Sequence, residues 1–140
     1  MEFQWEAFVG IRVFVVDDLQ HMRALLADVF AGDDRFQVVG TAGGEGEAKL
    51  WLEDHPAQWD IAVIDLMLSD GSGFGVIGRA RETNLHGCIC VLSSYLSETI
   101  ERHCLNLGAD VAFDKANSSD FLRWVARVSH SLGDSAGPQA

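Results

Sequence analysis

Basic residues are scarce in this chain, which has 10 Lys and Arg against 21 Asp and Glu and a net charge of −11 at pH 7. Nucleic-acid binding depends on clustered Lys and Arg that contact phosphates, so we expect no direct nucleic-acid binding. No apolar run reaches the roughly 18 residues of a membrane span, so we expect no membrane insertion. The N-terminus is acidic and lacks the basic start of a signal peptide, which favours a cytoplasmic location.

Cysteine is also rare, and three cysteines cannot all pair within one chain, so we expect no disulfide framework. The hydrophobic share of 48% is typical of a folded domain and too high for a disordered chain. A length of 140 residues suits a single domain. We place this domain at residues 10–132, with an N-terminal extension at 1–9 and a flexible tail at 133–140.

Short β-branched runs alternate with longer segments of helical spacing along the chain. The runs predict strands at 11–16, 36–41, 61–64, 88–92 and 110–114. Helices are expected after each strand, the last at about 118–132 with Phe121, Leu122, Val125 and Val128 facing inward. Ser97 is a candidate N-cap for the fourth helix. This alternation predicts an α/β fold, in which five helices cover a five-stranded parallel sheet.

Polar side chains follow four of these strands. Asp17 and Asp18 come after the first, Asp65 after the third, Ser93 after the fourth and Lys115 after the fifth. The carboxyl ends of parallel strands form the ligand-binding edge of such sheets, so these side chains are expected to meet. Clustered carboxylates repel one another unless a cation neutralises them, and Mg²⁺ prefers such oxygen ligands.

The hydroxyl of Ser93 and the ammonium of Lys115 cannot help to bind a bare cation, but both would bind the oxygens of a phosphoryl group. Asp65 ends the central strand and is the candidate nucleophile, forming an aspartyl phosphate. Asp18 alone is equally well explained as a helix cap.

Segments 15–18, 64–73, 91–94 and 108–115 together resemble the receiver domain of a two-component response regulator, of the stand-alone, chemotaxis type. The resemblance implies a flavodoxin-like, doubly wound sheet of order 2-1-3-4-5. It also implies that Asp17, Asp18, Asp65 and the backbone carbonyl of Met67 bind Mg²⁺. Asp65 would be the phosphoacceptor, Ser93 the switch hydroxyl and Lys115 the phosphate-pairing cation.

The function implied by the resemblance is a phosphorylation-dependent switch. The phosphoryl group would come from a histidine kinase or phosphotransfer protein. The signal would leave through contacts of the fourth and fifth helices and fifth strand with a downstream protein. One alternative is a degenerate receiver that is never phosphorylated. Another is a Mg²⁺-dependent phosphohydrolase, but Met67 stands where such enzymes often carry their acid/base aspartate. We therefore expect no enzyme beyond self-phosphorylation and slow dephosphorylation.

The chain departs from the family pattern at three positions. Ala116 replaces the proline after the lysine, which leaves open whether the Lys115–Ala116 peptide is cis. Ser69 replaces another frequent proline, a change expected to matter little. Ala112 replaces the aromatic switch residue, and strand alternation turns Phe113 to the opposite face. We expect Tyr95 to fill the space beside Ala112 and to move as the loop closes, although it could be a plain surface residue.

Two further patterns are weak. Residues 73–78 match the dinucleotide fingerprint G-x-G-x-x-G, but its first glycine lies too far beyond the strand. His86, Cys88 and Cys90 share one strand face, yet structural zinc sites favour other spacings, so we interpret the thiols as core residues.

Overall fold

The computed structural model describes residues 10–136, with side chains to residue 131. Five parallel strands form one sheet in the order β2-β1-β3-β4-β5, as expected from the resemblance. The strands are β1 (Ile11–Val16), β2 (Phe36–Ala42), β3 (Ile61–Ile64), β4 (Cys88–Ser93) and β5 (Val111–Asp114). The helices are α1 (Gln20–Ala31), α2 (Glu45–Asp54), α3 (Gly73–Thr83), α4 (Glu98–Leu107) and α5 (Ser118–Ala136), with a short 3₁₀ helix, η2, at Lys115–Asn117.

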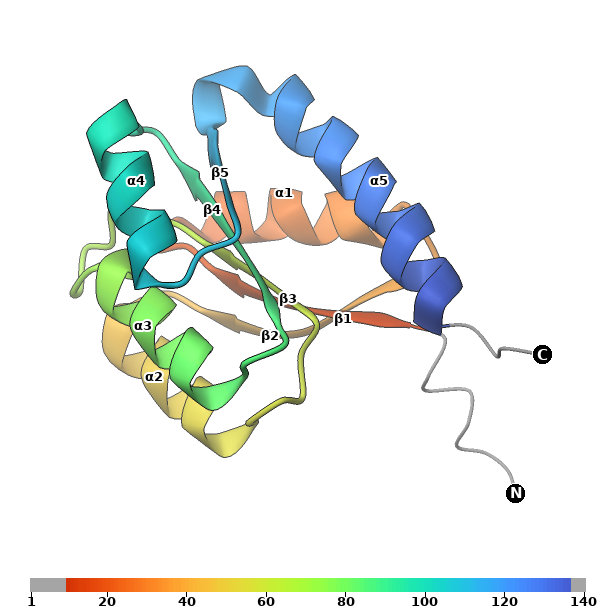
Figure 1. The fold of residues 1–140 in the computed structure, drawn as a ribbon, viewed down its shortest axis with the longest axis horizontal. Coiled ribbons are helices and arrows are strands. Elements are labelled where there is room, and N and C mark those ends of the chain that lie inside the picture. The colour runs from red at the N-terminus through yellow and green to blue at the C-terminus, as the bar shows by residue number, and fades with distance from the viewer. Residues whose placement is uncertain (1–9, 137–140) are drawn as a thin grey trace.

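Helices cover both faces of the sheet (Figure 1): α1 and α5 lie on one side, and α2, α3 and α4 on the other. The alternation of strand side chains divides the core accordingly. Phe14 and Val16 of β1 pack toward α2 and α3, whereas Val13 and Val15 pack toward α1 and α5. All four are buried, which explains why β1 reads as a nearly continuous apolar run.

Helix α5 differs from its prediction in two ways. It extends to Ala136 rather than to about residue 132. The predicted N-terminal extension at residues 1–9 and the end of the predicted tail at residues 137–140 lie outside the described part. Leu122 was expected to face the core but is 47% exposed, and Trp124 is buried instead. The buried stripe of α5 therefore follows positions 121, 124 and 125, a helical spacing that leaves Leu122 beside it.

The two ends of α4 are held differently. The Ser97 hydroxyl accepts a hydrogen bond from the N–H of Ile100, which confirms the predicted N-cap. At the other end, Arg81 of α3 donates to the Gly108 carbonyl and to the Asp110 carboxylate, both at 2.8 Å. Arg81 also donates to the Gly87 carbonyl at 2.8 Å, so one guanidinium ties the end of α3 to the loop after α4.

Within the described residues, we find no helix with the length and apolarity needed to cross a bilayer.

Candidate functional site

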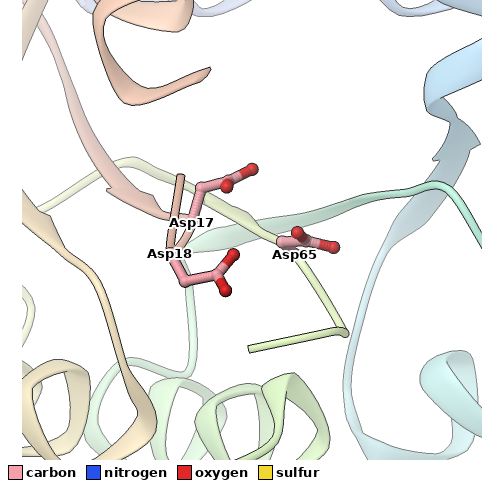
Figure 2. Close-up of side chains that lie close together, drawn as sticks. All are labelled: Asp17, Asp18 and Asp65. Atoms are coloured by element: carbon pink, nitrogen blue, oxygen red, sulfur yellow. The ribbon is translucent and has the colours of Figure 1, made fainter. Parts of the chain in front are cut away.

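Three aspartates meet at the carboxyl edge of the sheet, as predicted (Figure 2). Strands β1 and β3 are neighbours, with Val16 opposite Ile64, so the residues that follow them come together. Asp17, Asp18 and Asp65 each offer one carboxylate oxygen within 4.8 Å of the others. Asp17 and Asp65 are 1% and 5% exposed, whereas Asp18 is half-buried. Backbone topology thus holds three negative charges in a small and partly desolvated volume.

Lys115, which directly follows the carboxyl end of β5, completes this cluster. Its Nζ atom donates to Asp17 Oδ2 at 2.9 Å and to Asp65 Oδ2 at 3.1 Å. The lysine side chain is itself mostly buried, so solvent screens these two ion pairs only weakly. One ammonium nevertheless faces three carboxylates, and the cluster retains an excess of negative charge.

The pKa values of the buried pair reflect these contacts. Burial raises the pKa of Asp65, and it outweighs the hydrogen bond and charge of Lys115, which act in the opposite direction. Burial also opposes the charged form of Lys115, but its hydrogen bonds to Asp17 and Asp65 outweigh this and raise the pKa of the ammonium. Lys115 therefore stays charged at neutral pH, and Asp65 is a carboxylate that a further cation would stabilise.

Backbone N–H groups hold the three carboxylates in place. Leu19 donates to Asp17 Oδ1 at 3.0 Å, and Met67 donates to Asp65 Oδ1 at 3.3 Å. Asp17 and Asp65 therefore have a protein donor on each oxygen. Asp18 accepts a hydrogen bond on Oδ2 only, and no donor among the described residues reaches its Oδ1.

The donor set fits Mg²⁺, because hard carboxylate oxygens converge with one oxygen free of protein hydrogen bonds. Asp18 and Asp65 are the residues that would hold the ion directly. That Asp17 acts mainly through one of the waters that Mg²⁺ commonly keeps remains a prediction. The backbone carbonyl of Met67 remains a predicted ligand.

Comparison with known proteins identifies the family. The family profile described as "Response regulator receiver domain" matches residues 13–127. The chain belongs to this family. Receiver domains serve phosphorylation-based signalling in two-component systems, and this coarse role applies to the chain as a member.

Two curated relatives of this receiver domain are longer proteins. The DNA-binding transcriptional activator DevR/DosR of Mycobacterium tuberculosis is 33% identical over 100 residues, covering 71% of this chain and 45% of that protein. Protein-glutamate methylesterase/protein-glutamine glutaminase 2 of Anaeromyxobacter dehalogenans is 32% identical over 123 residues, covering 86% and 35%. The chain spans 24–45% of the length of five curated relatives that it matches. The DNA-binding and methylesterase activities that these names describe belong to those longer proteins.

A solved structure supports the fold assignment. The CheY-like receiver domain protein of Methanospirillum hungatei JF-1 aligns with a TM-score of 0.76 at 20% identity, covering 90% of this chain and 98% of that one. This similarity shows that the two chains share the fold.

The predicted switch hydroxyl lies where its strand position implies. Ser93 is fully buried at the end of β4, opposite Asp114 of β5, and its Oγ accepts a hydrogen bond from the N–H of Tyr95 at 3.3 Å. Ser94, one position later, is exposed. Strand alternation thus directs only Ser93 inward, although its role as the switch remains a prediction.

The aromatic pair behaves only partly as expected. Phe113 does face the α1 and α5 side, where its ring packs against Phe121 and Trp124. Ala112 packs on the opposite side with the α3 and α4 core. Tyr95 does not fill the space beside Ala112, because its side chain is 65% exposed in the loop before α4. The expectation of a filling ring is therefore wrong for this structure, while movement of Tyr95 on activation stays a prediction.

Both positions where the family often has proline use their backbone N–H here. Ala116 donates to Asp114 Oδ1 at 2.8 Å, and no peptide bond among the described residues is cis. Lys115 reaches its two carboxylates with this ordinary trans connection. Ser69 donates to Asp18 Oδ2 at 3.0 Å, a contact that sequence reasoning missed. Proline has no N–H, so the loss of proline at each position was the available signal.

The two weak motifs have structural explanations. Gly73 approaches the Asp65 backbone so closely that a Cβ would lie 2.1 Å from the Asp65 carbonyl oxygen, which accounts for a glycine at the start of α3. Cys90 is fully buried, and burial raises the pKa of the half-buried Cys88 thiol to about 11. Such a thiol stays protonated at neutral pH, which suits packing rather than metal binding.

An apolar groove opens beside the site, with a volume of about 350 Å³. It runs between α1 and the start of α5, and Lys115 forms part of its lining. Leu25 and Leu122, which are 55% and 47% exposed, line this groove. These two leucines thus leave an apolar surface next to the carboxylate cluster.

Proposed function

We propose that this receiver domain is a phosphorylation-dependent switch in which Asp65 accepts a phosphoryl group from a phosphohistidine. The donor is a histidine kinase or a phosphotransfer protein. The observation that carries this proposal is the geometry around Asp65. A buried carboxylate at the end of the central strand lies 3.1 Å from a charged ammonium and within reach of two further carboxylates.

The chemistry follows from these groups. A carboxylate oxygen of Asp65 attacks phosphorus, the P–N bond of the phosphohistidine breaks, and its electron pair goes to the imidazole nitrogen. Lys115, already beside Asp65, pairs with the phosphoryl oxygens, and the Ser93 hydroxyl donates to one of them. When bound at Asp18 and Asp65, Mg²⁺ supplies positive charge that neutralises the phosphoryl oxygens. Asp17 keeps Lys115 oriented through its 2.9 Å hydrogen bond.

The groove between α1 and α5 is the proposed docking site of the donor. It is apolar, and Lys115 links it to the phosphoacceptor. A helix that carries the phosphohistidine could bury apolar side chains against Leu25 and Leu122 while its imidazole faces Asp65. The downstream partner is proposed to contact α4, β5 and α5, the surface that the family resemblance implies.

We do not propose that this chain acts as an enzyme with multiple turnovers. Position 67, two residues after the nucleophile, carries methionine, so no acid/base group follows Asp65 there. We propose slow hydrolysis of the aspartyl phosphate and signalling through protein contacts in the cytoplasm. The net charge of −11 makes direct nucleic-acid binding by residues 1–140 unfavourable.

A degenerate receiver is the second candidate, because Ala112 supplies no aromatic switch. Backbone NMR spectra with Mg²⁺ and beryllofluoride, a phosphoryl analogue, separate the two. A phosphorylation switch shows chemical shift changes at Asp65, Ser93 and along α4, and Asp65→Asn abolishes them. A degenerate receiver shows none in the wild-type protein.

A further inference from the structure

We propose that the backbone N–H of Ser69 presets the Asp18 carboxylate for the metal, which makes Ser69 a positioning residue. This inference rests on the proposed Mg²⁺ site. Ser69 N–H donates to Asp18 Oδ2 at 3.0 Å, between residues 51 positions apart in the chain. The bond fixes one oxygen of Asp18 and leaves the other free to face the cluster.

Asp18 depends on this bond more than its neighbours depend on theirs. Asp17 and Asp65 are buried, and each also pairs with Lys115. Asp18 is half-buried, and the Ser69 N–H is the one donor to its carboxylate among the described residues. Without that donor, the Asp18 side chain gains rotameric freedom, and metal binding must then order it at an entropic cost.

The donor is part of a well-anchored turn. The N–H of Gly73 donates to the Leu66 carbonyl at 3.0 Å, and Met67 pairs with Ser72 in an antiparallel bridge. The turn therefore holds both the Met67 carbonyl and the Ser69 N–H in fixed relation to Asp65.

Glu45 at the start of α2 ties this turn to the rest of the fold. Its N–H donates to the Asp70 carbonyl at 2.8 Å, and its carboxylate accepts from the Ser72 N–H at 2.7 Å. Lys49 holds that carboxylate at 2.7 Å, and this hydrogen bond lowers the pKa of Glu45. The carboxylate thus stays charged at neutral pH, and the turn stays anchored.

The contact needs only a main-chain N–H, which gives a matched pair of variants. Ser69→Ala keeps the N–H and removes the hydroxyl, whereas Ser69→Pro removes the N–H. We expect Ser69→Ala to bind Mg²⁺ like the wild type and Ser69→Pro to bind it about three- to tenfold more weakly, as expected for one lost charge-assisted hydrogen bond. Glu45→Ala keeps the Ser69 N–H but removes the carboxylate that anchors the turn. We expect this variant to bind Mg²⁺ more weakly than the wild type, by a smaller factor than Ser69→Pro.

The measurement is calorimetric titration of each variant with Mg²⁺, with a thermal melt of each to confirm folding. The amide proton shift of Ser69 in wild-type and Asp18→Ala protein reports the hydrogen bond directly and is expected to differ between the two. If Ser69→Pro does not fold, the Glu45→Ala titration and the Ser69 amide shift test the role of Ser69 instead. Unchanged Mg²⁺ affinity in Glu45→Ala together with an unchanged amide shift in Asp18→Ala would contradict that role.

The outcomes separate the two proposals. If the wild-type protein binds no Mg²⁺, the proposed metal site fails, and this inference fails with it. If the wild type binds but Ser69→Pro binds equally well, only the role of Ser69 is overturned. Tighter binding by Ser69→Pro would mean that the N–H competes with the metal, and equal losses in both variants would assign the effect to the hydroxyl. Each of these results contradicts the inference.

Discussion

Asp65 is held in a position that disfavours its own charge. Burial raises its pKa above the usual 3.8, so the folded state binds the Asp65 proton more tightly than the unfolded chain does. A raised carboxyl pKa contributes stability below the unfolded value, and this contribution is lost as pH rises through the folded value. At neutral pH without metal, the ionised Asp65 therefore lowers the free energy of unfolding.

The first prediction follows from this sign. In metal-free protein at pH 7, Asp65→Asn is expected to raise the melting temperature by about 2–6 °C. The gain shrinks as pH falls through the raised folded-state pKa of Asp65, because the wild-type carboxyl is then protonated. Thermal melts of both proteins in chelator across pH 4–7 test it, and a lower melting temperature for Asp65→Asn at pH 7 would contradict the account.

The second prediction concerns the two serines after β4. Ser93 is buried and Ser94 is exposed, so only Ser93 is placed to reach a phosphoryl group on Asp65. Ser93→Ala is expected to reduce the beryllofluoride-induced NMR shifts in α4 by more than half, and Ser94→Ala to leave them unchanged. The reverse result would mean that the assignment is wrong by one residue.

The side chains of the site could be predicted from the sequence, whereas the backbone N–H groups that hold them in place could not. Asp17, Asp65 and Lys115 follow strands, and parallel strands bring their ends to one edge. The N–H groups of Leu19, Met67 and Ser69 belong to the main chain, and residue type does not reveal where a loop directs them. Only the absence of proline at position 69 gave a hint.

Helix α4 is lightly packed on the core. Cys104 is its one fully buried residue, and Ile100 and Leu107 are half-buried. Its C-terminal end relies on Arg81, which spans the loops before β4 and after α4 through several carbonyl groups. Such an element can shift at its N-terminal end, near Ser93, while the Arg81 contacts hold the other end.

The third prediction tests this anchor. Arg81→Lys keeps the charge but loses the planar fork, so several hydrogen bonds cannot form. We expect urea denaturation to show a loss of about 1–3 kcal/mol in the free energy of unfolding. Arg102→Lys is the matched control, because Arg102 is exposed and its pair with Glu98 has a length of 4.0 Å. Equal stability of Arg81→Lys and Arg102→Lys would show that Arg81 anchors nothing.

Elements were predictable to within a few residues, and helix faces were less so. Period-two and helical patterns gave five strands and five helices in the correct order along the chain. Leu25 and Leu122 fit the apolar stripes of their helices but lie at the stripe margins, where the facing helix does not cover them. Sequence periodicity defines the width of a stripe, while the packing of α1 beside α5 decides which edge remains exposed.

The order of the strands in the sheet could not follow from periodicity alone. Alternating strands and helices are compatible with several parallel sheets. The order 2-1-3-4-5 came from the resemblance, and the structure confirms it. This order makes β1 and β3 neighbours, which joins the two halves of the acidic cluster. It also places β5 two strands from β3, a gap that the long side chain of Lys115 spans.

The function proposed above requires that Asp65 becomes covalently phosphorylated with the help of Mg²⁺. The most direct test is to incubate the protein with acetyl phosphate, with and without Mg²⁺, and to measure its intact mass. We expect the addition of one phosphoryl group to the wild type in the presence of Mg²⁺ only, and no addition to Asp65→Asn. An unchanged wild-type mass, or an equal gain in Asp65→Asn, would contradict it.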